Sequence, residues 1–207
     1  MSYDTEHVRN AGGRTETITG IPTFTELLAN TNLASLYTSI RDSSPATAPD
    51  LVETADVSKK TVYEYLDRLE QAGLIRETGN EAGASEYTAE DFELTLTVQE
   101  VAVSITPELV EGIAHADAYP VVNRVLDENG LVTFALAHDL VKAHSDGDVT
   151  TRQIAQLTEL SPGTTYDLVE ALYRIHDLGD AESSPMTFTP DDVTGNTGDL
   201  RGEFPDQ

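Results

Sequence analysis

The sequence predicts a mostly α-helical chain with a small β content (α+β), organised as a tandem winged helix-turn-helix whose second copy is degenerate. Three observations lead to this fold class. Residues 47–87 have the order short helix, turn, longer helix, strand, loop and strand. The helical part of this order returns at residues 150–178, displaced by 103 residues. Elsewhere apolar residues recur mostly at helical spacing and alternate only between residues 92 and 105.

Changes in composition divide the chain into five segments. The two ends are polar and contain several glycines, which predicts that they do not pack into a core. The predicted segments are a flexible N-terminal arm at residues 1–20, a winged helix-turn-helix domain at 21–90, a β-hairpin at 91–105, a helical domain with a second helix-turn-helix-like unit at 106–190, and a disordered acidic tail at 191–207.

The first domain is expected to begin with one long helix. Thr23 and Glu26 have the spacing of a capping box, in which two side chains satisfy free amides at a helix start. Apolar residues then keep helical spacing as far as Ile40. The pattern predicts that this helix ends near residues 43–45, where two serines precede a proline.

Two further helices are expected before the wing. Thr47 can cap a short second helix and Ser58 a third, because a hydroxyl at the N-cap accepts a bond from the first free amides. Gly73 is well placed to end the third helix. One apolar face of the third helix is predicted to be buried, formed by Val62, Tyr65, Leu66 and Leu69.

The β content is expected in two short hairpins. Residues 74–77 suit a first wing strand, residues 79–83 a loop tip, and the segment through Tyr87 the returning strand. Apolar residues then alternate from Phe92 to Val98 and, one step out of phase, from residue 101 to 105. We interpret them as two strands joined near residues 99–100, although a single strand with a bulge fits almost as well.

The helical domain is expected to contain three segments before the second helix-turn-helix unit. Thr106 and Pro107 are a cap and a favoured first helical residue, and this helix is predicted to run through Tyr119. A second helix is expected at residues 120–127. A break at Gly130 separates it from a long helix that ends near residue 146.

The second unit repeats the first in its caps and core but not in its charge. Thr150, Ser161 and Tyr166 stand where the first copy has Thr47, Ser58 and Tyr63. The alternative is that any two amphipathic helix pairs align this well. Residues 58–76 carry four basic and three acidic side chains (+1), whereas residues 161–179 carry one and three (−2). We infer that the first copy binds DNA phosphate and that the second binds protein. Residues 186–189 are interpreted as a wing-like strand after the second copy.

The net charge of −25 is opposite to that of an ordinary DNA-binding domain, which is basic because it must meet phosphates. Acidic residues are spread along the whole chain, and lysine occurs only at three positions. This composition favours a halophilic origin over an acidic protein-binding tail. The chain has no cysteine, no signal-peptide pattern and no apolar run near the ~20 residues that span a bilayer. We therefore expect a soluble cytoplasmic protein.

The run from Val57 to Ile75, with a capped helix that ends in the pattern L-x-x-x-G-L-I, carries a resemblance to a known family. Residues 24–90 resemble the winged helix-turn-helix domains of archaeal and bacterial transcriptional regulators. With its acidity, the chain looks like a haloarchaeal member of that group. The resemblance implies sequence-specific binding of double-stranded DNA, with residues 58–72 in the major groove and residues 74–87 on the backbone.

The candidate DNA-binding side chains lie opposite the apolar face of the third helix and at the base of the wing. Lys60 and Tyr63 are expected at base edges or neighbouring phosphates. The alternative for Tyr63 is that it packs against the second helix. The alternative for the two lysines is that they only solvate a helix end. Arg68 is expected to pair with Glu64 and not to bind DNA. The full candidate set is Ser58, Lys59, Lys60, Thr61, Tyr63, Glu64 and Arg76.

Other chemistry finds little support in the sequence. Five histidines show no metal-ligand spacing, and there is no phosphate-binding loop, nucleophile elbow or dinucleotide fingerprint. We expect no enzyme activity, no metal and no cofactor. The competing class is a tandem winged-helix module that binds proteins and not DNA. A homodimer through residues 106–178 is expected, because a two-fold pair reads two half-sites.

Overall fold

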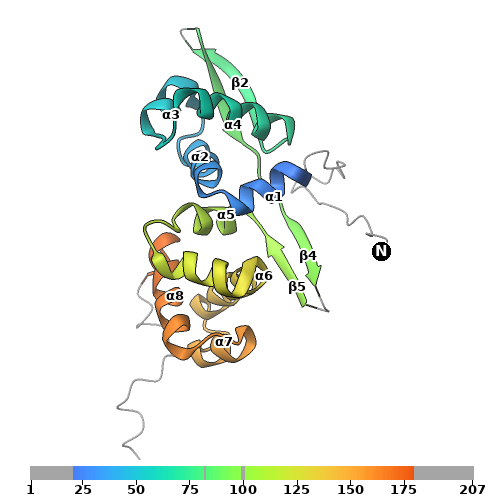
Figure 1. Ribbon diagram of the computed structural model, residues 1–207, viewed down its shortest axis with the longest axis vertical. Coiled ribbons are helices and arrows are strands. Elements are labelled where there is room, and N and C mark those ends of the chain that lie inside the picture. Colours follow the sequence, from blue (N-terminus) through green and yellow to red (C-terminus); the bar gives the residue numbers. More distant parts are fainter. Residues whose placement is uncertain (1–20, 82, 99–100, 180–207) are drawn as a thin grey trace, which may run out of the picture.

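The computed structural model describes residues 21–81, 83–98 and 101–179. The predicted arm at 1–20, the tail at 191–207 and the strand at 186–189 lie outside the described residues. Figure 1 shows two parts, one with α1 to α4 and the wing, the other with α5 to α8. The first part comprises α1 (Ile21–Ala29), α2 (Thr31–Asp42), β1 (Ala46–Thr47), α3 (Ala48–Thr54), α4 (Lys59–Gln71), β2 (Ile75–Glu81) and β3 (Ala84–Ala89).

The single N-terminal helix predicted from the sequence is wrong, because the chain forms two helices that meet at Asn30. Asn30 has an extended backbone, and its side chain accepts hydrogen bonds from the amides of Asn32 and Leu33. It therefore caps α2 and ends α1. Thr23 is not the cap, since α1 already begins at Ile21. The periodicity missed this break because the apolar spacing continues across it.

The two predicted helices of the helix-turn-helix are confirmed. Thr47 caps α3 by accepting from the amide of Asp50, and Ser58 caps α4 by accepting from the amide of Thr61. Val62, Leu66 and Leu69 are buried, as expected. Tyr65 is only half-buried, and its hydroxyl accepts a hydrogen bond of 3.0 Å from the Asn30 amide group. Gly73 ends the helix in the left-handed region with φ +72°.

The wing belongs to a three-stranded antiparallel sheet with the order β1-β3-β2. β2 and β3 pair from Ile75 with Ala89 to Glu81 with Ala84, so both strands are longer than predicted. β1 was not predicted, and it pairs Ala46 with Tyr87. This short strand ties the start of α3 to the wing.

The second part begins with β4 (Leu94–Val98) and β5 (Val101–Ile105), followed by α5 (Pro107–Ala114), α6 (Pro120–Ser145), α7 (Thr151–Thr158) and α8 (Pro162–Ile175). β4 and β5 form a separate antiparallel hairpin. The hairpin interpretation is therefore confirmed over the single bulged strand.

The helical part differs from the prediction at one helix end. α5 ends at Ala114, not Tyr119, because the residues between them form turns. The predicted break at Gly130 is confirmed as a kink inside α6, with φ 85° and ψ 168°. Thr150 and Ser161 cap α7 and α8 by accepting from the amides of Gln153 and Thr164.

One continuous hydrophobic core runs through both parts. α2 lies at its centre and packs against α5, where the Ser35 hydroxyl donates to the carbonyl of Ala114 at 3.1 Å. The Tyr37 hydroxyl donates to the carbonyl of Glu90 at 3.0 Å. These bonds fix α2 between the wing and the helical part. Among the described residues, no helix is long and apolar enough to cross a membrane.

Candidate nucleic-acid interface

The amino-terminal end of α4 presents the candidate side chains on one exposed surface. Ser58, Lys59, Lys60, Tyr63 and Glu64 are exposed, while Thr61 is partly buried. The hydroxyls of Ser58 and Thr61 lie 2.7 Å apart, and Ser58 also accepts from the Thr61 amide at 3.2 Å. Both hydroxyls therefore serve the helix cap, and a phosphate would have to share them.

Lys59 and Tyr63 lie one turn apart and contact each other. The Lys59 ammonium stands 5.9 Å from the centre of the Tyr63 ring, which is within the range of a cation–π contact. Tyr63 is 40% exposed, so part of its side chain is accessible from outside. In the part of the chain that the structure describes, Lys59 forms no ion pair. Its charge is therefore free to meet a phosphate.

Lys60 is held differently, because its ammonium lies 3.3 Å from the Glu64 carboxylate. The Lys60 side chain is 86% exposed and that of Glu64 50%. An exposed ion pair at this spacing contributes only ~0.3–0.5 kcal/mol, so a phosphate could replace the carboxylate. Glu64 nevertheless places a negative charge on the surface expected to meet DNA.

Arg76 stands apart from the other candidates, at the start of β2. Its side chain is 67% exposed, and its Nε lies 3.0 Å from the carboxylate of Glu90. None of the contacts described here joins it to residues 58–64. It lies at the wing base, as predicted, but a carboxylate already neutralises it.

The predicted pair between Arg68 and Glu64 is wrong. Arg68 contacts Glu26 of α1 at 2.5 Å, and Glu64 contacts Lys60. Arg68 therefore joins α1 to α4, and its charge is paired with Glu26. Its partner lies 42 residues away, and no local spacing rule could identify it.

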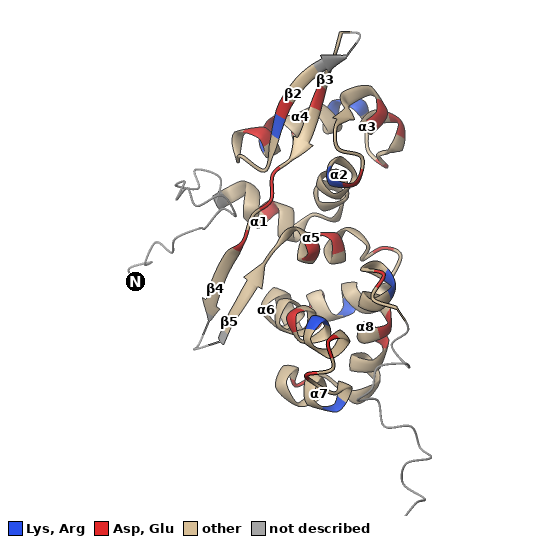
Figure 2. Ribbon diagram, turned by 180° about the vertical axis from the view of Figure 1, so that it is seen from behind, with Lys and Arg blue, Asp and Glu red and all other residues tan. Residues whose placement is uncertain are grey.

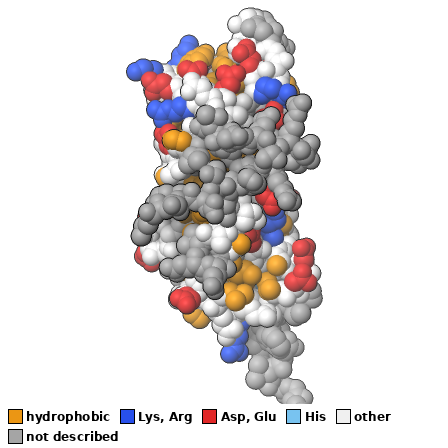
Figure 3. Space-filling view, turned by 90° about the vertical axis from the view of Figure 1, so that its right-hand side faces the viewer, with side chains coloured by type: hydrophobic (Ala, Val, Ile, Leu, Met, Phe, Trp, Pro, Cys, Tyr) orange, Lys and Arg blue, Asp and Glu red, His pale blue; other side chains and the backbone are white. Residues whose placement is uncertain are grey.

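The surface around α4 is mixed and not basic. Residues 21–93 hold five Lys and Arg against fourteen Asp and Glu. Figure 2 shows acidic residues on α3, β2 and β3 around the basic ones. In the space-filling view of Figure 3, blue and red side chains alternate at the end that carries the wing. Any attraction to phosphate is therefore local to individual basic side chains, of which Lys59 and Lys60 stand together at the start of α4.

The described residues contain no cluster of three or more potential metal ligands. The exposed side of the amino-terminal end of α4 instead offers hydroxyl, ammonium and phenol groups. These groups can donate hydrogen bonds to phosphates and base edges. The arrangement suits recognition of a duplex.

Comparison with protein families gives one match. Residues 31–93 match the family described as sugar-specific transcriptional regulator TrmB. The match spans α2 to the residues after β3 and covers less than a third of the chain. Searches of curated proteins and of solved structures found no match. Residues 31–93 are thus similar to the TrmB family of transcriptional regulators, a winged-helix DNA-binding family.

Proposed function

We propose that this protein is a sequence-specific transcriptional regulator of a halophilic archaeon, acting on DNA in the cytoplasm. In this proposal α4 enters the major groove and the wing lies along the backbone. The family match over residues 31–93 carries the proposal. The exposed polar surface at the start of α4 supports it.

The role proposed for each side chain depends on the contacts that it already makes within the protein. Lys59 and Tyr63 have the fewest competing partners and are proposed at base edges or the nearest phosphates. Lys60 and Arg76 are proposed to exchange Glu64 and Glu90 for phosphate. Ser58 and Thr61 would add hydroxyl contacts beside the cap, and Glu64 would act by disfavouring some base sequences.

The proposal is tested by removing the two lysines together. Lys59→Ala combined with Lys60→Ala is expected to weaken binding to a fragment of the protein's own promoter by about tenfold or more, measured by gel shift. The matched control is Arg124→Ala with Arg152→Ala, which also removes two exposed cations that have no ion pair in the described structure. Equal affinity of the wild type and the lysine variant would contradict the assignment of Lys59 and Lys60 as DNA-binding residues.

A second candidate function, protein binding, is favoured by one observation on the second helix-turn-helix unit. Leu157 on α7 and Tyr166 on α8 are 57% and 47% exposed. We propose that this unit is a degenerate copy of the first and forms the homodimer contact within residues 106–178. Light scattering of Leu157→Ser with Tyr166→Ser is expected to show monomers where the wild type shows dimers. Monomeric wild type would contradict the dimer.

A further inference from the structure

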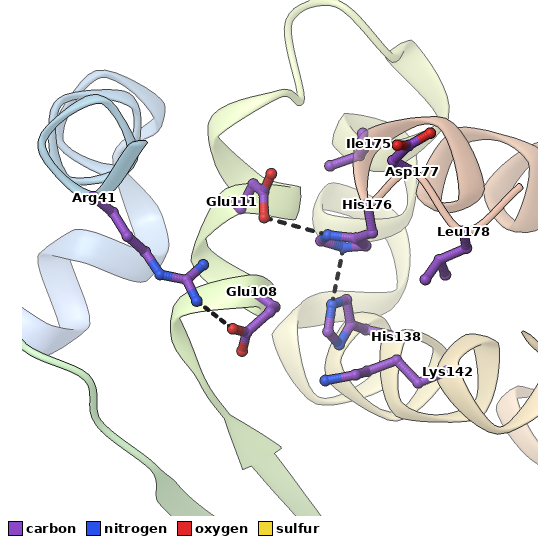
Figure 4. A pocket seen from close by; sticks show the side chains of 9 residues that line it. All are labelled: Arg41, Glu108, Glu111, His138, Lys142, Ile175, His176, Asp177 and Leu178. Atoms are coloured by element: carbon purple, nitrogen blue, oxygen red, sulfur yellow. Dashed lines mark hydrogen bonds and ion pairs between the residues drawn. The ribbon is translucent and has the colours of Figure 1, made fainter. Parts of the chain in front are cut away.

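A polar cleft of about 380 Å³ lies where the winged part meets the helical part. Figure 4 shows Arg41 entering it from α2, opposite the ends of α6 and α8. Its volume is in the range of sites for small molecules. Seven of its nine lining residues carry polar or charged side chains; the lining residues are Arg41, Glu108, Glu111, His138, Lys142, Ile175, His176, Asp177 and Leu178.

Two carboxylates of the cleft already have partners. Glu108 contacts Arg41 at 2.5 Å, and Glu111 lies 3.3 Å from Nδ1 of His176. The third, Asp177, is exposed, and in Figure 4 its carboxylate points away from the histidines. Arg41 therefore neutralises Glu108, whereas Glu111 has a hydrogen-bond partner whose charge depends on the protonation of His176.

Two polar groups of the cleft have no hydrogen-bond partner or close ion pair among the described residues. Lys142 is exposed and forms no ion pair within the described residues. His138 is 1% exposed, and its Nδ1 has no hydrogen-bond partner, since the Asp139 carboxylate is 3.8 Å away. The two residues are four apart on α6 and therefore share one face of the helix. A buried polar atom without a partner is unfavourable and points to a missing ligand group.

The two histidines determine what Nδ1 of His138 can do. His176 holds its Nδ1 hydrogen toward Glu111, because a carboxylate can only accept. The Nε2 atoms of His176 and His138 lie 3.1 Å apart and must share one hydrogen. When His176 is protonated, it donates from Nε2, and His138 then carries its own hydrogen on Nδ1. In that state Lys142, His138 and the remaining N–H groups of Arg41 all offer donors.

We propose that this cleft binds a small anion, the carboxylate or phosphate group of a metabolite, through Lys142, Nδ1 of His138 and Arg41. Nδ1 of His138 can donate to the anion only while the rings of His138 and His176 hold three hydrogens between them. The neighbouring charges are Glu108 and Glu111 on α5, Asp139 and Lys142 on α6, Asp177 after α8, and Arg41 on α2. The bound anion would touch both parts of the molecule, because Arg41 belongs to the winged part.

The test is calorimetric titration of the full chain with inorganic phosphate and, separately, with citrate in chloride buffer. One saturable site for either probe is expected, and the probe that binds identifies the anion. Lys142→Gln should lower the affinity about tenfold or more, because a charge-assisted contact is lost. Arg124→Gln, which removes an exposed cation from the same helix, should leave it unchanged.

The pH dependence of binding gives a second readout. Affinity should be higher near pH 6 than near pH 8, because low pH favours the state with three ring hydrogens, whereas either probe becomes more negative as the pH rises. The proposal is overturned if neither anion saturates a site at millimolar concentration, if both variants lose affinity equally, or if affinity does not fall between pH 6 and pH 8. The assay contains no DNA, so its outcome is independent of the proposed regulator function.

Discussion

Glu64 limits the positive charge that the start of α4 can present. Its carboxylate holds the Lys60 ammonium at 3.3 Å on the surface expected to meet DNA. The pair is exposed and adds little to stability, so its removal should leave the fold intact. Its main effect is therefore on any polyanion that approaches the helix.

Glu64→Gln is expected to tighten binding to a promoter fragment a few-fold, because it frees Lys60 and removes a negative charge from the contact surface. Glu70→Gln is the matched control, since Glu70 is exposed on α4 but lies toward the helix end away from Lys59. Gel-shift titration compares the two. Weaker binding by Glu64→Gln would instead give this carboxylate a base contact.

The ionisation of Glu108 is expected to make the free energy of unfolding depend on pH in the acid range. Burial raises its pKa, but hydrogen bonds from Thr106 and the backbone, together with Arg41, outweigh burial and lower the pKa from 4.5 to about 2. Because the pKa is lower in the folded protein, ionised Glu108 stabilises the fold at pH values above about 4.5. This contribution is lost as the pH falls from about 4.5 to 2.

Glu108→Gln should accordingly reduce the free energy of unfolding at neutral pH by about 1–2 kcal/mol, after allowance for its partial exposure. The difference from wild type should shrink steadily below about pH 4.5. Chemical denaturation at several pH values measures it, with the exposed Glu93→Gln as control. A difference that does not change with pH would rule out the ion pair as its source.

At the scale of elements, Asn30 separates α1 from α2 and also donates to the Tyr65 hydroxyl. Asn30→Ala should destabilise the protein by about 1–2 kcal/mol and lower its melting temperature by several degrees, because α2 loses its cap. Thr23→Ala, at the cap expected from the sequence, should change little. Thermal unfolding of both variants decides between them, and the reverse order would contradict the helix break.

The elements that local rules define could be predicted. The caps Thr47 and Ser58, the stop at Gly73 and the kink at Gly130 depend on a residue and its immediate neighbours. β1 could not be predicted, because a strand of two residues exists only through its pairing with β3. The break at Asn30 was hidden because apolar residues keep their spacing on both sides.

The same distinction applies to the candidate interface. The exposure of Lys59 and Lys60 follows from the buried face of their own helix and was predicted, whereas the sequence left open whether Tyr63 packs against the second helix. The partners of Arg68 and Arg76 lie on α1 and after β3, so the sequence did not reveal that carboxylates hold them. The histidine cleft was missed for the same reason, since Glu111, His138 and His176 are far apart in the chain.

At the scale of the whole molecule, the charge of −25 sets the salt dependence of DNA binding. Three phosphate contacts, from Lys59, Lys60 and Arg76, would alone give a slope of about −2.7 for log affinity against log salt. The acidic surface around them should oppose this by taking up cations on binding. When DNA affinity is measured at a series of potassium chloride concentrations in the molar range, we expect a slope smaller in magnitude than this value, or a positive slope. A steeper loss of affinity would contradict the account.

The position of the three lysines has a practical consequence. Two stand at the start of α4 and the third lines the cleft between the two parts. Side-chain amines therefore occur only at the two surfaces to which functions are proposed. An amine-reactive label, followed by peptide mass analysis, would report on both surfaces in one experiment. Protection of Lys59 and Lys60 by DNA and protection of Lys142 by an anion would be measured as separate losses of labelling. The experiment needs no engineered residue.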